Sequence, residues 1–271
     1  INGDKSGAIE GVVRLLKRLD DLHQPQHICV FFDQPQQKTA RKILDPTYKS
    51  NRRPTPQTLR PQLTSAPSLL KSASINCMTC TGIEADDMIA SYTSALFTSG
   101  YDVLIVSNDN DFLQLARGER RTKDAKDADP GPTAPTSDGE TAPDAAAPYV
   151  EIYQMNKRRY LRERHIRSRF NVPPWQLPDF FALCGISWGK LPRVEGVTDE
   201  IAVELLTKYG SLPRLLRNLD EIEDPVLRKT LKHSIGHIES AYRISKLVDH
   251  YALPSAIEEL VVPRFDGFPK V

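Results

Sequence analysis

The sequence predicts an α/β protein in which a parallel-sheet domain comes first and a helical domain follows. Short apolar runs alternate with segments of helical spacing in the first half of the chain, which is typical of a parallel sheet. Several of these runs end in carboxylates, and the functional crevice of such sheets lies at the carboxyl ends of the strands. From Asn156 almost to residue 250 the apolar residues recur at helical spacing, which predicts the second domain.

The expected elements follow from these patterns in chain order. Helical spacing predicts a helix over Gly7–Leu22, and Gly82-Ile83-Glu84 opens a second helix that runs through Phe97. Apolar runs and alternation predict strands at Ile28–Phe32, Ile75–Thr81, Tyr101–Ser107 and Tyr149–Met155. The helices expected in the second half are Lys157–Phe170, Gln176–Gly185, Thr198–Tyr209, Pro213–Leu219 and Ile235–His250.

Residues 117–148 differ in composition from the rest of the chain. They are rich in Ala, Pro, Thr, Asp and Gly, and such a segment cannot bury a core, so we expect a disordered or solvent-exposed insertion. We therefore predict a sheet domain at residues 1–155 that this insertion interrupts, a helical domain at 156–250 and a C-terminal tail at 251–271.

Composition limits the class of protein. The chain has 271 residues and a formal net charge of +1, and no run of about 18 or more apolar residues predicts a membrane span or a membrane partner. Four cysteines do not make a disulfide framework in a chain of this length. Cys77 and Cys80 have CxxC spacing, but we expect small buried strand residues there rather than a zinc or redox site. Because the chain begins at Ile1 without a Met, we expect the natural N-terminus to lie upstream.

Six carboxylates fall at or just beyond the ends of the expected strands. They are Asp33, Glu84, Asp86, Asp87, Asp109 and Asp111. Such a cluster repels itself unless cations neutralise it, and hard divalent ions such as Mg²⁺ or Mn²⁺ suit oxygen ligands. Two such ions about 4 Å apart can clamp the attacking and leaving oxygens of a phosphodiester. For any one of these acids the alternative is a helix cap or a strand-end turn.

Five motifs in collinear order carry a family resemblance. They are Phe32-Asp33 with Lys38–Arg41 and Tyr48–Pro54, then Gly82–Asp87, Ser107–Asp111, Leu177–Gly185 and Lys208–Leu212. In this order they resemble the 5′-nuclease (flap-endonuclease-like) superfamily, and most closely the 5′→3′ exonuclease domain of bacterial DNA polymerase I. The resemblance covers nearly the whole chain apart from the insertion.

The resemblance implies a PIN-like parallel-sheet domain followed by a helix–three-turn–helix domain. It also implies that the six carboxylates form the metal site, with Asp87 beside the direct ligands. Lys49 and Arg52 would reach the scissile phosphate, while Lys38, Arg41 and Arg53 would guide the nucleic-acid strand. Lysine and arginine side chains stabilise the charge that develops on a phosphoryl group. The alternative for this set of residues is an ordinary solvated basic face.

The sequence departs from the family at two places in the second half. Ile186 and Gly189 stand where the family carries ligating aspartates, so these ligand positions are lost. We therefore expect Mg²⁺ or Mn²⁺ at one site at most, with the second metal weakened or absent. The following hairpin carries Thr198 in place of a glycine, and we expect Thr198 to cap a helix whose first turn holds Asp199 and Glu200.

The segment Lys157–Arg169 is strongly basic. Its candidate nucleic-acid-binding residues are Arg158, Arg159, Arg162, Arg164, Arg167 and Arg169, set against one acid, Glu163. Arginine at this density favours phosphate backbones, and we expect RNA or a structured duplex as the partner. A solvated helix face and an acidic protein partner are the alternatives.

Together these features favour a nucleic-acid-binding family member with impaired or lost catalysis that serves as a scaffold, for example in an organellar ribonucleoprotein assembly. An active Mg²⁺-dependent 5′-3′ exonuclease or flap endonuclease acting on DNA or RNA primers is the alternative. A protein-interaction module without a nucleic-acid role is a third hypothesis. The resemblance and the insertion lead us to expect a mitochondrial location.

Overall fold

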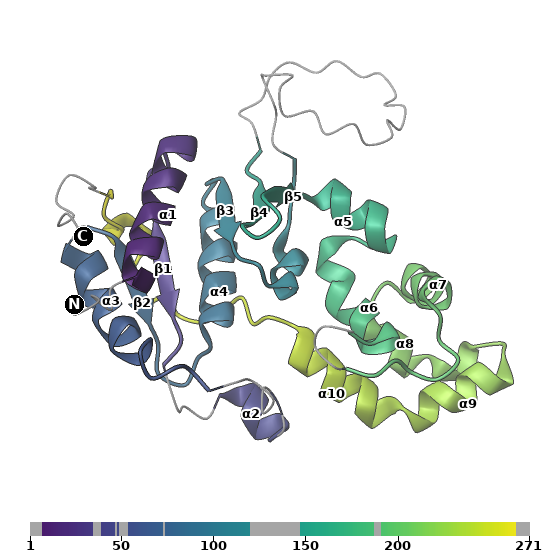
Figure 1. The fold of residues 1–271 in the computed structure, drawn as a ribbon. Helices are drawn as coiled ribbons and strands as arrows, with labels where there is room; N and C mark the ends of the chain where they lie inside the picture. The colour runs from purple at the N-terminus through teal and green to yellow at the C-terminus, as the bar shows by residue number, and fades with distance from the viewer. Residues whose placement is uncertain are drawn as a thin grey trace, which may run out of the picture. The chain divides into compact units, whose positions relative to one another are not determined.

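The computed structural model describes residues 7–34, 39–46, 48, 54–72, 74–119, 147–186 and 191–263. Packing divides the chain into two compact units, one formed by Ile1–Ser91 with His250–Val271 and the other by Tyr92–Asp249. Figure 1 labels the elements of both. These units are defined by packing alone. They do not test the predicted domain boundaries near residues 155 and 250, which remain predictions.

The first unit is built around a pair of parallel strands. Its helices are α1 (Gly7–His23), α2 (Ala40–Leu44), α3 (Arg60–Ser72) and the first half of α4 (Ala85–Thr98). Strands β1 (Cys29–Phe32) and β2 (Asn76–Thr79) pair in parallel, with Cys29 opposite Asn76. This arrangement confirms the predicted helix at the start of the chain, the two predicted strands and the helix that follows Glu84.

The core of the first unit joins α1, α3 and β2. Val13 and Leu16 from α1 pack with Leu70 from α3 and with Ile75 and Cys77 at β2. The two α1 residues lie three positions apart, so helical spacing places both on one buried face. Burial of this apolar surface is the main stabilising contribution in this unit.

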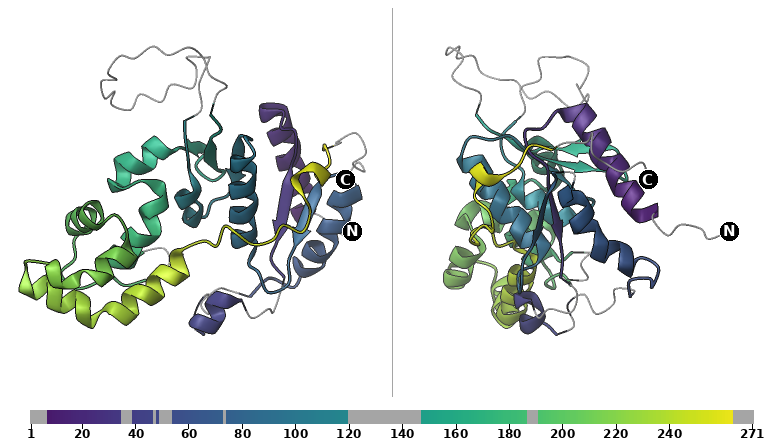
Figure 2. Two further views of the ribbon diagram at one scale, coloured as in Figure 1. Left: turned by 180° about the vertical axis from the view of Figure 1, so that it is seen from behind. Right: turned by 90° about the vertical axis from the view of Figure 1, so that its left-hand side faces the viewer.

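The C-terminal segment returns to the first unit, as Figure 2 shows in yellow. The side chain of Asn76 bonds both backbone groups of Val261: its amide nitrogen donates to the Val261 carbonyl oxygen at 3.0 Å, and its oxygen accepts from the Val261 nitrogen at 3.0 Å. Nearer the start of the segment, the Tyr251 nitrogen donates to the hydroxyl oxygen of Ser91 at 3.1 Å. A single side chain therefore anchors the far end of the chain to β2.

The second unit begins with a three-stranded sheet. Strands β3 (Val103–Val106), β4 (Val150–Gln154) and β5 (Arg159–Leu161) lie in the order β3-β4-β5. The β3–β4 pair is parallel and the β4–β5 pair antiparallel. The predicted strands at Tyr101–Ser107 and Tyr149–Met155 are confirmed, whereas residues 120–146 of the predicted insertion lie outside the described residues.

Helices form the rest of the second unit. They are α5 (Glu163–Phe170), α6 (Leu177–Cys184), α7 (Asp199–Tyr209), α8 (Leu212–Arg217), α9 (Pro225–His233) and α10 (Ile235–Ser245). Every residue of α6 is buried, and α6 packs against both α7 and α10. No helix in the described part of the chain is long and apolar enough to cross a membrane.

The predicted helix over Lys157–Phe170 is wrong in its first half. Residues 155–158 form a turn in which Arg158 has a positive φ of 49°, and β5 follows before α5 begins at Glu163. The rings of Tyr153 and Tyr160 lie 4.8 Å apart across the β4–β5 pair. This cross-strand packing outweighs the helix propensity of the basic residues.

Other helices differ from the prediction at their ends or were missed. The last helix stops at Ser245 rather than His250. Neither α3 nor α9 was predicted, because α3 contains Pro67 and α9 buries only Leu231. Proline and a thin apolar face both weaken the periodic signal of a helix.

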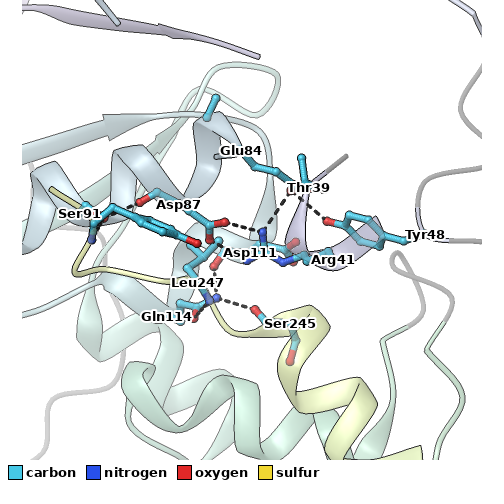
Figure 3. Close-up of polar contacts among 12 residues, drawn as sticks. Thr39, Arg41, Tyr48, Glu84, Asp87, Ser91, Asp111, Gln114, Ser245 and Leu247 are labelled. Carbon is cyan, nitrogen blue, oxygen red and sulfur yellow. Dashed lines mark hydrogen bonds and ion pairs between the residues drawn. The ribbon is translucent and has the colours of Figure 1, made fainter. Parts of the chain in front are cut away.

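Gln114 ties two distant parts of the second unit together. Its amide nitrogen donates to the carbonyl oxygens of Asp111 at 2.7 Å and Ser245 at 3.0 Å, and its oxygen accepts from the Leu247 nitrogen at 3.0 Å (Figure 3). The residue lies in η1 (Asn110–Leu115), so it holds the end of α10 beside that turn.

Substituting Gln114 with leucine should lower the free energy of unfolding by about 2–3 kcal/mol, because buried backbone groups lose their partners. Urea denaturation of the two proteins measures the difference. The exposed Gln57→Leu is the control and should change stability by less than about 0.5 kcal/mol. Equal stability of the Gln114 variant and the wild type would show that these hydrogen bonds contribute little.

The cysteines are free thiols in buried or half-buried positions. Burial raises the pKa of Cys29 and of Cys77 to about 11, and it raises the pKa of Cys184 to about 12. A raised pKa keeps the thiol protonated and unreactive. Cys77 belongs to the core of the first unit, as expected for a small buried strand residue.

Candidate nucleic-acid and metal site

The carboxylates of the first unit meet at the start of α4. Asp33 follows β1, and its Oδ1 accepts a hydrogen bond from the Ala85 nitrogen at 2.8 Å. Glu84, Asp86 and Asp87 lie at the start or in the first turn of the same helix. An anionic side chain at this end satisfies an unpaired backbone N–H and interacts favourably with the helix dipole. Asp33 therefore has a capping role in the fold, which does not depend on a metal.

A buried arginine contacts two of these carboxylates, as Figure 3 shows. Arg41 donates from Nη1 to Glu84 Oε2 at 3.1 Å and to Asp87 Oδ2 at 2.8 Å. Its Nη2 donates to Asp87 Oδ1 at 2.7 Å. The two bonds to Asp87 form the bidentate geometry that favours arginine over lysine.

This cluster lies almost completely out of water. The side chains of Arg41 and Glu84 are each 6% exposed, and that of Asp87 is 7% exposed. Burial acts to lower the pKa of Arg41, but the hydrogen bond and charge of Asp87, with smaller contributions from Tyr48 and Glu84, raise this pKa above its usual value. The guanidinium therefore stays charged and offsets one of the two negative charges. Arg41, for which the sequence predicted a role in guiding the nucleic-acid strand, is thus buried among acids in this structure.

Two residues without a predicted role complete the cluster. Thr39 Oγ1 donates to Glu84 Oε1 at 2.7 Å, and the Tyr48 hydroxyl lies 3.5 Å from Glu84 Oε2. Both belong to the segment after β1 that carries Arg41. No local pattern marks them, because the contacts join residues 36 or more positions apart.

The remaining acids follow β3 in the second unit. Asp109 Oδ1 accepts from the Asp111 nitrogen at 3.0 Å, and the Asp109 nitrogen donates to Ser107 Oγ at 3.1 Å. Asp109 is thus the N-cap of η1. The six acids thus fall into one group in each unit, and their predicted convergence on a single metal site remains a prediction.

The position predicted to have lost its first ligand holds a buried side chain. Ile186 is 4% exposed, and its backbone forms a bridge with Leu191 through hydrogen bonds of 2.8 Å and 3.2 Å. Gly185 precedes it with φ 73° and ψ 173°, a conformation that is essentially restricted to glycine. The side chain of Ile186 is therefore part of the core. Gly189 lies outside the described residues.

The hairpin before α7 has the structure predicted from its side chains. Thr198 is the N-cap of α7 and accepts from the Ile201 nitrogen at 3.3 Å, which confirms that prediction. Arg193 donates to the Val197 carbonyl oxygen at 2.9 Å and pairs with Asp199 Oδ1 at 2.6 Å. The acid in the first turn of α7 is thus compensated by a cation within the same loop.

The arginines of the basic segment fall into two groups. Arg162 is buried and pairs with Glu151 at 2.8 Å, and Arg159 bonds Gln154 at 3.1 Å, so both have structural contacts in the sheet. The exposed group consists of Arg158, Arg164, Arg167 and Arg169. Arg164 and Arg167 pair with Glu119 and Glu163 at the surface. The prediction that Arg162 faces nucleic acid needs correction, because its guanidinium is enclosed beside β4.

The other predicted basic site residues lie outside the described residues. They are Lys38, Lys49, Arg52 and Arg53. Among the described residues, no three His, Cys, Asp or Glu side chains are arranged to hold a metal ion. In this structure Glu84 and Asp87 share the Arg41 guanidinium as a hydrogen-bond donor.

Two protein-family models match this chain. One family model, described as 5′-3′ exonuclease, N-terminal resolvase-like domain, matches residues 1–133. A second, described as 5′-3′ exonuclease, C-terminal SAM fold, matches residues 172–267. The class is therefore an α/β resolvase-like domain joined to a helical SAM-fold domain, and the predicted fold class is confirmed.

Relatives and solved structures agree with this class. A 5′-3′ exonuclease of Aquifex aeolicus is 29% identical over 97% of this chain and 79% of its own length. A flap endonuclease Xni of Cronobacter sakazakii is 30% identical over 86% of this chain and 80% of its own. The bacteriophage T5 D15 flap endonuclease, solved as a pseudo-enzyme–product complex with DNA and metal ions, shares the fold with a TM-score of 0.66, 19% identity and coverage of 92% and 84%. This chain belongs to the 5′-3′ exonuclease family.

Proposed function

We propose that this chain is a nucleic-acid-binding member of the 5′-3′ exonuclease family whose hydrolytic activity is lost or strongly weakened. The observation that carries the proposal is Ile186, which stands at an expected ligand position, is buried, and has both backbone groups bonded to Leu191. A hydrocarbon side chain supplies no oxygen to Mg²⁺ or Mn²⁺. The Arg41 guanidinium supports the proposal, because it donates to both Glu84 and Asp87 and offsets part of the charge that would attract a divalent ion.

Nucleic-acid binding is supported by the exposed cations around α5. Arg158, Arg164, Arg167 and Arg169 are exposed, and the surface partners of two of them are acids that a phosphate can replace. The T5 relative was solved with DNA, which gives a precedent on the same fold. We propose RNA or a structured duplex as the partner, held through the phosphate backbone.

An active nuclease is the second candidate. It is favoured by the acids that the chain retains in both units. They are Asp33, Glu84, Asp86 and Asp87 in the first unit and Asp109 and Asp111 in the second. The names of the relatives, 5′-3′ exonuclease and flap endonuclease, agree with it.

Cleavage by the full-length protein separates the two candidates. Wild type and Asp109→Ala are incubated with 5′-flap DNA and with an RNA:DNA hybrid in Mg²⁺ or Mn²⁺. Binding without cleavage supports the proposal. Cleavage by the wild type that Asp109→Ala abolishes would establish the active nuclease instead.

The salt dependence of binding measures how many phosphates the exposed arginines neutralise. Replacing Arg164, Arg167 and Arg169 by Gln should flatten the slope of log affinity against log salt by about 0.9 for each duplex-DNA phosphate that is no longer neutralised. The control removes the same charge from Arg18, Lys229 and Arg243, which are exposed elsewhere. If both triple variants behave alike, α5 is not the binding surface.

We further propose that the protein acts in mitochondria, within a large ribonucleoprotein. The basic surface around α5 supports an RNA partner, because exposed arginines favour phosphate backbones. Fractionation of cells expressing the tagged full-length protein tests both points. Recovery in cytosolic fractions, or as a species that ribonuclease treatment leaves unchanged, would contradict them.

A further inference from the structure

A basic hollow lies where α7 ends and α8 begins. Its volume is about 410 Å³, and its lining residues are Lys208, Tyr209, Arg214, Arg217 and Asn218. Three of these residues are cations and none is an acid. The hollow lies at the opposite end of α7 from Thr198, a distance of about 16 Å at the usual helical rise. It is therefore separate from the hairpin that precedes α7.

The cations of this hollow outnumber the acids that flank them in the chain. Residues 204–220 contain Lys208, Arg214 and Arg217 with two acids, Glu204 and Asp220, and Asp220 pairs with Lys232. Arg217 bonds the Pro213 carbonyl oxygen at 3.1 Å, and within the described residues none of the three cations forms an ion pair. A cation at a helix C-terminus is common because of the helix dipole, and this accounts for Lys208. It does not account for Arg214 and Arg217, which belong to the next helix.

The ring of Tyr209 forms part of the wall of the hollow. The Lys208 Nζ lies 5.3 Å from the centre of this ring. The Tyr209 hydroxyl is closed off from solvent and has no hydrogen-bond partner in the described part of the chain, so a ligand in the hollow would contact the cations rather than this hydroxyl.

We propose that this hollow binds a phosphate group, with Arg214 and Arg217 as the charged donors. Arginine guanidinium groups match the geometry of phosphate oxygens. The phosphate belongs to a nucleic-acid strand, and this part of the inference rests on the proposed function. The hollow shares no lining residue with the exposed arginines of α5 or with the predicted metal-binding acids.

Titration of the full-length protein with inorganic phosphate tests the site without nucleic acid. The double variant Arg214→Gln/Arg217→Gln should bind phosphate at least about tenfold more weakly. Each substitution removes a charge-assisted hydrogen bond, and the free energy of one such bond corresponds to roughly a tenfold change in affinity. The matched control, Lys229→Gln/Arg243→Gln, removes the same charge from exposed positions on α9 and α10. Equal affinities in the two double variants would overturn the proposal.

A nucleic-acid titration then identifies the source of the phosphate. Oligonucleotides with and without a 5′-phosphate are compared on wild type and on the Arg214→Gln/Arg217→Gln variant. Weaker binding of both oligonucleotides by the variant indicates backbone phosphate, and a loss confined to the phosphorylated one indicates a strand end. If inorganic phosphate binds at this site but no oligonucleotide does, the strand assignment and the proposed function fail while the phosphate site stands. Tight binding of acidic peptides but not of phosphate would overturn the inference.

Discussion

Replacing Arg41 by alanine should lower the free energy of unfolding by about 3–5 kcal/mol, because two buried carboxylates lose their cation. Glu84 and Asp87 are almost completely buried, and three hydrogen bonds from the guanidinium join them to α2. Once it is gone, their charges are neither hydrated nor paired with this cation. Urea denaturation measures the decrease in stability.

Two controls identify the cause of that decrease. Arg164→Ala breaks an exposed pair, with Glu119, and should cost no more than about 1 kcal/mol. The triple variant Arg41→Met/Glu84→Gln/Asp87→Asn removes all three charges and should recover most of the stability, because a well-packed neutral cluster can replace a buried ionic one. If Arg41→Ala is as stable as Arg164→Ala, the cluster does not hold α2 against α4.

Replacing Gly185 by alanine should cost about 3–5 kcal/mol, the sum of backbone strain and overpacking. A Cβ atom there would lie 2.5 Å from the Leu191 carbonyl oxygen, 2.7 Å from the Arg193 nitrogen and 2.8 Å from the Pro192 carbonyl carbon. These are backbone atoms, so no side-chain rotation relieves the close approach. The displaced segment is the one that pairs with Ile186.

Gly196→Ala is the matched control for this substitution. Gly196 has a similar φ of 71°, but a Cβ atom there meets nothing within 4 Å. Its cost should be about 1–2 kcal/mol, from the left-handed backbone alone. Similar costs at Gly185 and Gly196 would show that the backbone of Leu191–Arg193 can move aside.

Much of the fold could be predicted from local pattern. The buried strand at Val103–Val106 is a continuous apolar run, and α1 and α6 have strong helical spacing. The Thr198 cap followed from side-chain type alone, since Thr at an N-cap satisfies a backbone N–H. Such features depend on residues that are close in sequence.

The features that could not be predicted depend on residues far apart in the chain. Arg41 looks like a surface arginine until its partners 43 and 46 positions away are known. Gln114 bonds residues 131 and 133 positions away, and Asn76 reaches Val261 across 185 positions. The basic segment was predicted as one helix for the same reason, because the pairing of β5 with β4 is a tertiary interaction.

The number of divalent ions that bind to the protein tests the central claim most directly. Mn²⁺ is titrated into the wild-type full-length protein with a 5′-flap DNA present, and bound ions are counted by electron paramagnetic resonance. We predict fewer than two bound ions for each chain, with nucleic acid retained. Two tightly bound ions for each chain, accompanied by cleavage of the flap, would contradict the account.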